Sequence, residues 1–161
     1  MNMYTETTDD AIKKYCMVSN LEKIKELDMD DDNISSVVRH ACLYDKPDVI
    51  KHILPEADIE FVMKAYCQYS HTLDILHFLL QTEHKNFMLK FLSENRVYYP
   101  SSGLYREVIG FLKERVNPQD CVPCIRDAIL KMKYEEHIKM ETILQYTPLY
   151  VDIISIIKGY F

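Results

Sequence analysis

The residues best placed to do chemistry are Cys121 and Cys124, which form a C-x-P-C motif. Thiol oxidoreductases carry such a pair at the start of a helix that follows a β-strand, where the helix dipole lowers the pKa of the first thiol. In this sequence the preceding residues, 104–116, have the apolar spacing of a helix instead. A zinc site would need two further ligands at suitable spacing, and His137 is the nearest imidazole downstream. We therefore expect two small apolar residues at a helix start, with thiol or zinc chemistry as the alternative.

The other ionisable residues do not form the pattern of an active site. Glu135 and Glu136 are adjacent in sequence, so on a helix they point in different directions and cannot work as an acid–base pair. The six histidines share no motif, and no Ser-His-Asp or Cys-His arrangement stands out. The sequence therefore predicts a protein that is not an enzyme, with no catalytic residue, no bound metal and no cofactor.

The composition predicts a helical protein of one domain. Of the 161 residues, 48% are hydrophobic and 27% are charged, as in a soluble globular protein. Three glycines and six prolines are too few for the frequent turns of an all-β fold, and no glycine-rich phosphate loop occurs. We expect a single all-α domain over residues 1–161.

Charge and the terminal segments bear on partners and location. The net charge of −6 weighs against nucleic acid, which attracts clustered lysine and arginine. The opening "MNMYTETTDD" lacks the pattern of a signal peptide, and the apolar residues 148–161 are interrupted by Asp152 and Lys158 and too short to span a bilayer. We expect a cytoplasmic protein with free thiols and with neither nucleic acid nor membrane as a partner.

The elements that would position any site come from a repeat of 26 residues. The segment "DVIKHI" at Asp48 is preceded by "EKIKEL" at Glu22 and followed by "DILHFL" at Asp74. Periodicity of this length is typical of stacked helical hairpins, each of which needs its neighbour to cover an apolar face. The pattern predicts first helices near residues 9–19, 35–45 and 60–70, and second helices near 21–28, 47–55 and 73–81.

The same register predicts part of the core. Ile50 and Ile53 lie on one face of a second helix, so we expect both to be buried between neighbouring hairpins. Cys16, Cys42 and Cys67 are spaced like repeat positions of the first helices. They are therefore expected to be small core residues.

Residues 40–61 resemble the second half of an ankyrin repeat. The matching positions are the small pair Ala41-Cys42, Asp45-Lys46 at the Gly-His turn, the apolar pairs Val49-Ile50 and Ile53-Leu54, and Ala57-Asp58 at the "GAD". "TPLY" at residues 147–150 resembles the "TPLH" that opens a repeat. The resemblance implies an ankyrin-like solenoid of hairpins that binds a protein and has no catalytic activity.

The sequence also departs from that family. A spacing of 26 residues leaves no room for the usual β-finger, and the turn glycines are missing. Such a degenerate array is similar to those of poxviruses and other large DNA viruses. Abundant Ile, Lys and Tyr are typical of AT-rich coding sequence, which fits large DNA viruses and several protists. The resemblance then implies a host partner in cell defence or ubiquitin-dependent turnover. A compact bundle with a Bcl-2-like groove, regulating apoptosis or innate signalling, is the alternative.

Beyond residue 84 the pattern is less regular. The sequence predicts a helix over 85–95, a loop over 96–103, an amphipathic helix over 104–116 and a helix that starts at Pro118 or Pro123. The segments 134–146 and 148–161 follow. We expect a C-terminal helical cap, although the sequence leaves open that these helices continue the stack.

The candidate binding surface consists of residues that the repeat does not need for its own core. Met17, Leu43 and Tyr69 share the 26-residue register, Tyr44 and Tyr66 lie beside them, and His40 is one turn before Tyr44. In the ankyrin-like alignment these positions face the concave groove. A row of exposed aromatic and apolar side chains is typical of a protein-binding surface. The alternative is that residues 85–161 fold back and cover the row.

Overall fold

The computed structural model describes residues 7–95 and 102–146, and every regular element in these ranges is a helix. The elements are α1 (Thr8–Met17), α2 (Leu21–Lys25), α3 (Asp31–Leu43), α4 (Pro47–Ile53), α5 (Ile59–Tyr69), α6 (Asp74–Leu79), α7 (Lys85–Glu94), α8 (Ser102–Lys113), the short 3-10 helix η1 (Pro118–Asp120) and α9 (Pro123–Tyr146). The prediction of an all-α fold is confirmed for this part of the chain. The N-terminal segment 1–6, most of the predicted loop at 96–103, the TPLH-like start and the apolar segment 148–161 lie outside the described residues.

Local side-chain contacts explain where the helices begin. The Thr7 hydroxyl accepts a hydrogen bond from the Asp10 backbone N–H, and the Asp10 carboxylate accepts one in return, which forms a capping box before α1. Asp30 accepts from the Asn33 backbone N–H at 2.8 Å and so caps α3. Pro47 is the first residue of α4, where its missing N–H leaves no hydrogen bond unmade. The predicted helix starts therefore have identifiable physical causes.

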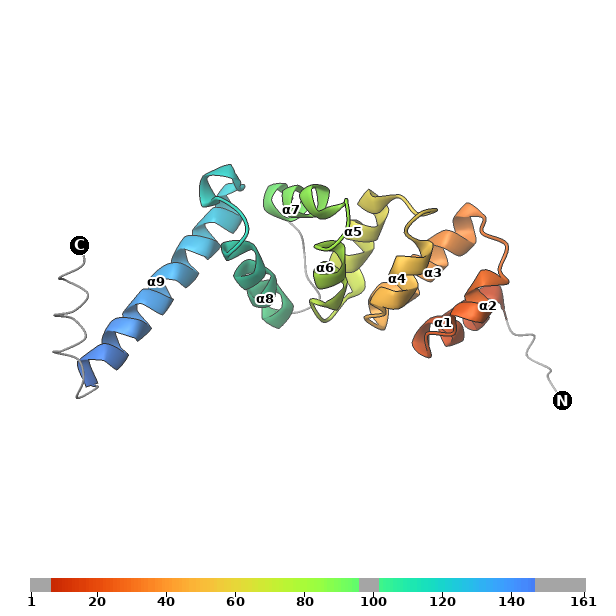
Figure 1. The fold of residues 1–161 in the computed structure, drawn as a ribbon, viewed down its shortest axis with the longest axis horizontal. Coiled ribbons are helices and arrows are strands. Elements are labelled where there is room, and N and C mark those ends of the chain that lie inside the picture. Colours follow the sequence, from red (N-terminus) through yellow and green to blue (C-terminus); the bar gives the residue numbers. More distant parts are fainter. Residues whose placement is uncertain (1–6, 96–101, 147–161) are drawn as a thin grey trace.

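The first six helices form pairs that lie side by side. In Figure 1 they run as an elongated row from the pair α1–α2 to the pair α5–α6. Helix α1 packs on α2 and α3, helix α3 packs on α4 and α5, and α4 packs on α6. This elongated row differs from a compact bundle, which was the alternative architecture.

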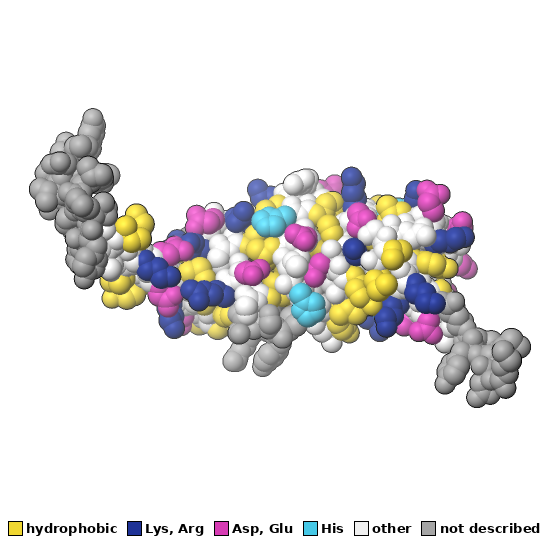
Figure 2. Space-filling model, turned by 90° about the horizontal axis from the view of Figure 1, so that it is seen from below, with side chains coloured by type: hydrophobic (Ala, Val, Ile, Leu, Met, Phe, Trp, Pro, Cys, Tyr) yellow, Lys and Arg dark blue, Asp and Glu magenta, His cyan; other side chains and the backbone are white. Residues whose placement is uncertain are grey.

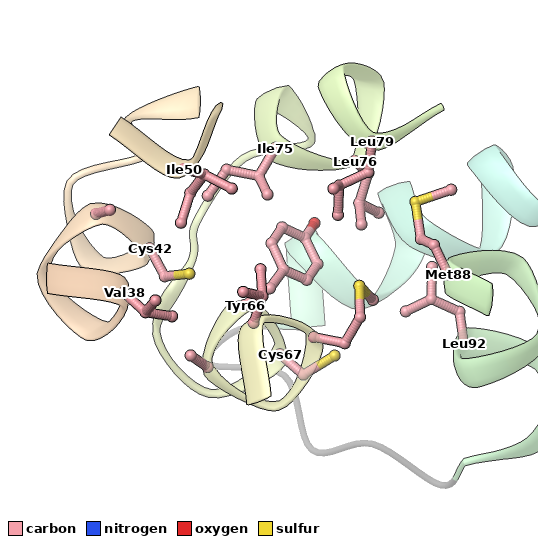
Figure 3. Packing of buried hydrophobic residues seen from close by; sticks show 14 of the residues in the cluster. Val38, Cys42, Ile50, Tyr66, Cys67, Ile75, Leu76, Leu79, Met88 and Leu92 are labelled. Carbon is pink, nitrogen blue, oxygen red and sulfur yellow. The ribbon is translucent and has the colours of Figure 1, made fainter. Parts of the chain in front are cut away.

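One apolar position of the 26-residue register is buried in all three second helices. On the second helices Ile24, Ile50 and Leu76 are fully buried. Ile53 is also buried, as predicted, whereas its equivalent Leu27 in the first pair is half-buried. Figure 3 shows Ile50 and Leu76 pointing into the interior that their pairs share with α5. The difference at Leu27 is expected for the end of a row, because among the described residues only one side has a neighbouring pair.

The turns after α1 and α3 are built alike. Ser19 and Asp45, 26 residues apart, have positive φ angles of 53° and 50°. Behind them Asn20 N–H donates to the Tyr15 carbonyl and Lys46 N–H to the Ala41 carbonyl, each at 2.8 Å. This is the left-handed helix ending for which glycine is the usual residue. The chain thus makes the turns without glycine, at the cost of backbone strain.

Helices α7, α8 and α9 extend the row at its far end. Contacts run from α6 to α7, from α7 to α8 and from α8 to α9. The Val122 N–H just before α9 donates to the Ser93 carbonyl of α7 at 3.0 Å. The helix predicted to start at Pro118 or Pro123 begins at Pro123, and it continues without a break through residues 134–146. No helix in the described ranges is both long and apolar enough to cross a bilayer.

Candidate protein-binding surface

Three predicted site residues occupy the same place in their helices. Met17, Leu43 and Tyr69 are the last residues of α1, α3 and α5. Met17 is 50% exposed and Leu43 is 37% exposed, whereas Tyr69 is half-buried. The three residues therefore share one helix position, and their exposure decreases from the first helix pair to the third.

The residues that follow them extend the surface. Val18 and Tyr44 cap α1 and α3 with nearly the same backbone angles, φ −101° and ψ 6° for Val18 and φ −101° and ψ 8° for Tyr44. Val18 is 65% exposed, and Tyr44 is half-buried with its ring stacked on His40 at 6.4 Å. Sequence analysis missed Val18, although its register position next to Met17 was the signal that could have found it.

Hydrogen bonds between turns show that these helix ends lie next to one another. The Ser19 hydroxyl, two residues after α1, donates to the Asp48 carboxylate at the start of α4 at 3.4 Å. The Asp45 carboxylate, two residues after α3, accepts from the His71 N–H at 3.1 Å and the Thr72 N–H at 3.3 Å, just after α5. The ends of α1, α3 and α5, with their exposed or half-buried apolar residues, therefore follow one another along the three helix pairs. We call the residues Met17, Val18, Leu43, Tyr44 and Tyr69 the apolar row.

The prediction that Tyr66 belongs to the exposed surface is wrong. Its side chain is fully buried, and the phenol donates a hydrogen bond to the Thr72 carbonyl at 2.9 Å. Burial raises the pKa of this phenol far above its usual value. Figure 3 shows the ring pointing toward α6. Tyr66 fills the core of the third pair, because Tyr69, one turn later, lies on the outer side of α5.

His40 lies mostly beneath the surface and supports the row. Its side chain is 15% exposed, with Nε2 3.3 Å from the Asp9 carboxylate of α1. Asp9 also accepts a hydrogen bond from the buried Ser36 hydroxyl. That bond, and then the contact with His40, lowers the pKa of Asp9 below its usual value.

These three residues do not have the connectivity of a catalytic triad. In a triad the histidine lies between the serine and the acid, so that it can take the proton from the hydroxyl. Here the Asp9 carboxylate lies between Ser36 and His40, and both contact the same oxygen. The cluster joins α1 to α3 and leaves no activated hydroxyl.

Four of the five cysteines are buried, where a structural role explains them, whereas Cys124 of the predicted pair at the start of α9 is exposed. Cys16, Cys42 and Cys67 are buried, as predicted, and burial raises the pKa of the Cys16 thiol to about 12. Cys121 is also buried, which together with Asp120 raises the pKa of its thiol. An activated thiol needs the opposite shift. Within residues 7–95 and 102–146 the structure groups no three metal-binding side chains of His, Cys, Asp or Glu.

The surface charges are mixed. On the face shown in Figure 2, lysine and arginine side chains lie among acidic and apolar ones instead of forming one continuous basic patch. This distribution agrees with the overall net charge of −6.

Comparisons with known proteins found no relative of the chain. No family model matches the sequence, and no curated protein or solved structure was found to be similar to it.

Proposed function

We propose that the chain is a non-catalytic binding module that holds another protein against the apolar row. The observation that carries this proposal is the exposure of Met17, Val18 and Leu43 at the ends of helices whose inner faces are already filled. Contiguous exposed apolar side chains are disfavoured on a free surface and typical of an interface. Half-buried tyrosines such as Tyr44 and Tyr69 are the kind of anchor that interfaces favour.

We infer an ankyrin-like arrangement for the helix pairs that carry the row. In support of this arrangement, α1 packs on α3 and α3 packs on α5. Each of these helices is followed in the chain by a shorter second helix, α2, α4 or α6. Asp45 has the positive φ expected where the resemblance aligns it with a turn glycine. The links between pairs, residues 26–30 and 54–58, are too short for a β-finger. The proposed array is therefore reduced to its helices and turns.

Two observations favour binding over catalysis. The Asp9, Ser36 and His40 cluster has the wrong connectivity for nucleophilic attack. The pKa of Cys121, the first thiol of the C-x-P-C motif, is raised, which is opposite to the shift that activates a nucleophilic thiol.

The test replaces the two most exposed helix-end residues with charged ones. Met17→Asp together with Leu43→Asp should reduce the amount of bound partner by at least about tenfold, because each carboxylate would have to be desolvated against an apolar surface. The partner is first identified by placing a photo-crosslinking residue at position 43 and analysing cell extracts by mass spectrometry. Binding of the purified partner to each variant is then measured by calorimetry.

A matched control separates the apolar row from general effects of an added charge. Phe87 on α7 is 38% exposed, close to the 37% of Leu43, but lies away from the row. Phe87→Asp should leave partner binding unchanged. A double variant that keeps its melting temperature and still binds the partner would refute the proposed surface.

A further inference from the structure

A cation precedes each of the two exposed helix ends of the apolar row. Lys13 lies four residues before Met17 on α1, and Arg39 lies four residues before Leu43 on α3. At that spacing the charged and the apolar side chain share one face of their helix. Both cations are exposed, and they are 26 residues apart, so they occupy the same position of the repeat. We call Lys13 and Arg39 the basic pair.

Contacts between α1 and α3 place the basic pair on neighbouring helices. Asp9 of α1 contacts His40 of α3, with 3.3 Å between Oδ1 and Nε2. In the chain this contact lies one turn before Lys13 and next to Arg39. On α5 the equivalent position is the buried Ala65. The basic pair is therefore confined to the first two helix pairs, which also carry the most exposed part of the apolar row.

Neither member of the basic pair is the main partner of an acid on α1. Hydrogen bonds from Thr7 lower the pKa of Asp10 most, and the charge of Lys13 lowers it least. On Asp9 the hydrogen bond from the buried serine of α3 lowers the pKa most, and the charge of Arg39 lowers it least. These two carboxylates are held by hydrogen bonds within the chain.

The acids on the turn side of the row are also engaged. The Asp45 carboxylate accepts the hydrogen bonds that link two turns, and Asp48 accepts from the Ser19 hydroxyl at 3.4 Å. Arg39 donates from Nε to the Ser35 carbonyl of its own helix at 3.4 Å, a contact that neutralises no charge. The basic pair therefore offers its charge to a partner, whereas these acids are already bonded.

We propose that the partner held by the apolar row is an acidic segment, in which carboxylates lie beside the apolar side chains. This inference rests on the proposed function, because it describes the partner of the same surface. The apolar side chains of the segment would contact the row, and its carboxylates would lie against Lys13 and Arg39. Complementary charges at the edge of an interface select the partner and orient it. The net charge of −6 repels an acidic segment at long range, so binding also requires the apolar contacts.

A library of random peptides displayed on phage tests the chemistry of the partner. The full chain should select peptides that combine apolar residues with Asp and Glu, both above their share in the library. Binding of these peptides should be lost when Met17→Asp is combined with Leu43→Asp. That loss would show that the selected peptides occupy the apolar row.

Charge reversal then tests the basic pair. Lys13→Glu with Arg39→Glu should raise the dissociation constant of the selected peptides at least about tenfold, because like charges then face one another. The same double variant should select new peptides with Lys and Arg in place of Asp and Glu. Lys13→Gln with Arg39→Gln removes the two charges without adding acids, and should raise the dissociation constant by a smaller factor, about threefold.

The second helices provide a matched control. Lys25 on α2 and Lys51 on α4 are exposed, lie 26 residues apart and belong to the same two helix pairs. Lys25→Glu with Lys51→Glu changes the net charge by the same amount as the reversed basic pair. It should leave the dissociation constant of the selected peptides unchanged. Circular dichroism of each variant should show the helix content of the unmodified chain.

Two results would overturn the inference and leave the proposed function standing. One is a set of peptides that need Met17 and Leu43 but are not enriched in Asp and Glu. The other is an equal change of the dissociation constant in the reversed basic pair and in the control, which would assign the effect to net charge. A chain that selects no peptide dependent on Leu43 would overturn the proposed function as well.

Discussion

The turn after α3 depends on the Asp45 side chain, and replacing it tests how neighbouring helix pairs hold together. The Asp45 carboxylate accepts hydrogen bonds from the His71 N–H at 3.1 Å and the Thr72 N–H at 3.3 Å, and from the Ser70 hydroxyl. Ser70 is fully buried. Asp45 itself has a φ of 50°, a conformation that aspartate tolerates better than most residues. One side chain thus stabilises its own turn and the next.

Three substitutions separate the two contributions. Asp45→Ala removes the hydrogen-bond acceptor. It also leaves at positive φ a residue whose side chain cannot form a local hydrogen bond, so the substitution should lower the unfolding free energy by about 3 kcal/mol. Asp45→Gly removes the acceptor but suits the backbone, and should cost about 2 kcal/mol. Asp45→Asn keeps one oxygen as acceptor and should cost about 1 kcal/mol or less. The Ser70 hydroxyl can turn to the Thr72 carbonyl 3.5 Å away, which limits the loss in all three.

Urea denaturation of the full chain, followed by circular dichroism, measures these differences. The denaturant slope should stay the same across the variants, since none of them changes the surface exposed on unfolding. The informative feature is the order of stability, with Asn above Gly and Gly above Ala. If Asp45→Gly were as stable as the unmodified chain, the contacts to Ser70, His71 and Thr72 would contribute nothing, and the reasoning would be wrong.

Three further changes test the core, the turns and the charges. Ile53→Ala should lower the unfolding free energy by about 2–5 kcal/mol through lost burial and a cavity, and a loss below about half a kilocalorie in urea denaturation would contradict its place in the core. Ser19→Gly should raise the melting temperature slightly, with a gain of about 0.5 kcal/mol, because glycine suits its φ of 53°; an unchanged or lower value would mean that the Ser19 hydroxyl matters more than the strain. The pKa of Asp9 is lowered in the folded state, so its contribution is present above the unfolded pKa of about 4 and lost as the pH falls further. Asp9→Asn should therefore cost less than about 1 kcal/mol at pH 7 and nothing near pH 2, and an equal loss at both would exclude the charge as the cause.

Much of the backbone could be predicted from the sequence because its causes are local. Thr7, Asp30 and Pro47 start helices through contacts within a few residues, so their effect is visible in the chain itself. The register of Ile24, Ile50 and Leu76 predicted burial because each pair needs the next to cover its apolar face. For α9, which runs unbroken from Pro123 to Tyr146, only the start of the helix could be predicted.

The candidate site was harder to predict, because exposure depends on what the neighbouring pair supplies. Lys14, His40 and Tyr66 occupy one register position on the first helices, and they are exposed, mostly covered and fully buried in that order. The residue types change with their surroundings, from a charged side chain to a large aromatic one that fills the core. A repeat therefore predicts the backbone of each copy but not the environment of its side chains. Tyr66 was misassigned for that reason.

The same gradient along the row bears on where a partner would bind. Met17 and Val18 in the first pair are more exposed than Leu43 in the second, and Tyr69 in the third is half-buried. Since binding energy comes from apolar surface that a partner removes from water, the first two pairs offer most of it. Substitutions at Met17 and Leu43 should therefore weaken partner binding more than one at Tyr69, whose buried part also supports the helix end. An equal or larger loss of affinity on replacing Tyr69, without a loss of stability, would place the centre of the interface in the third pair.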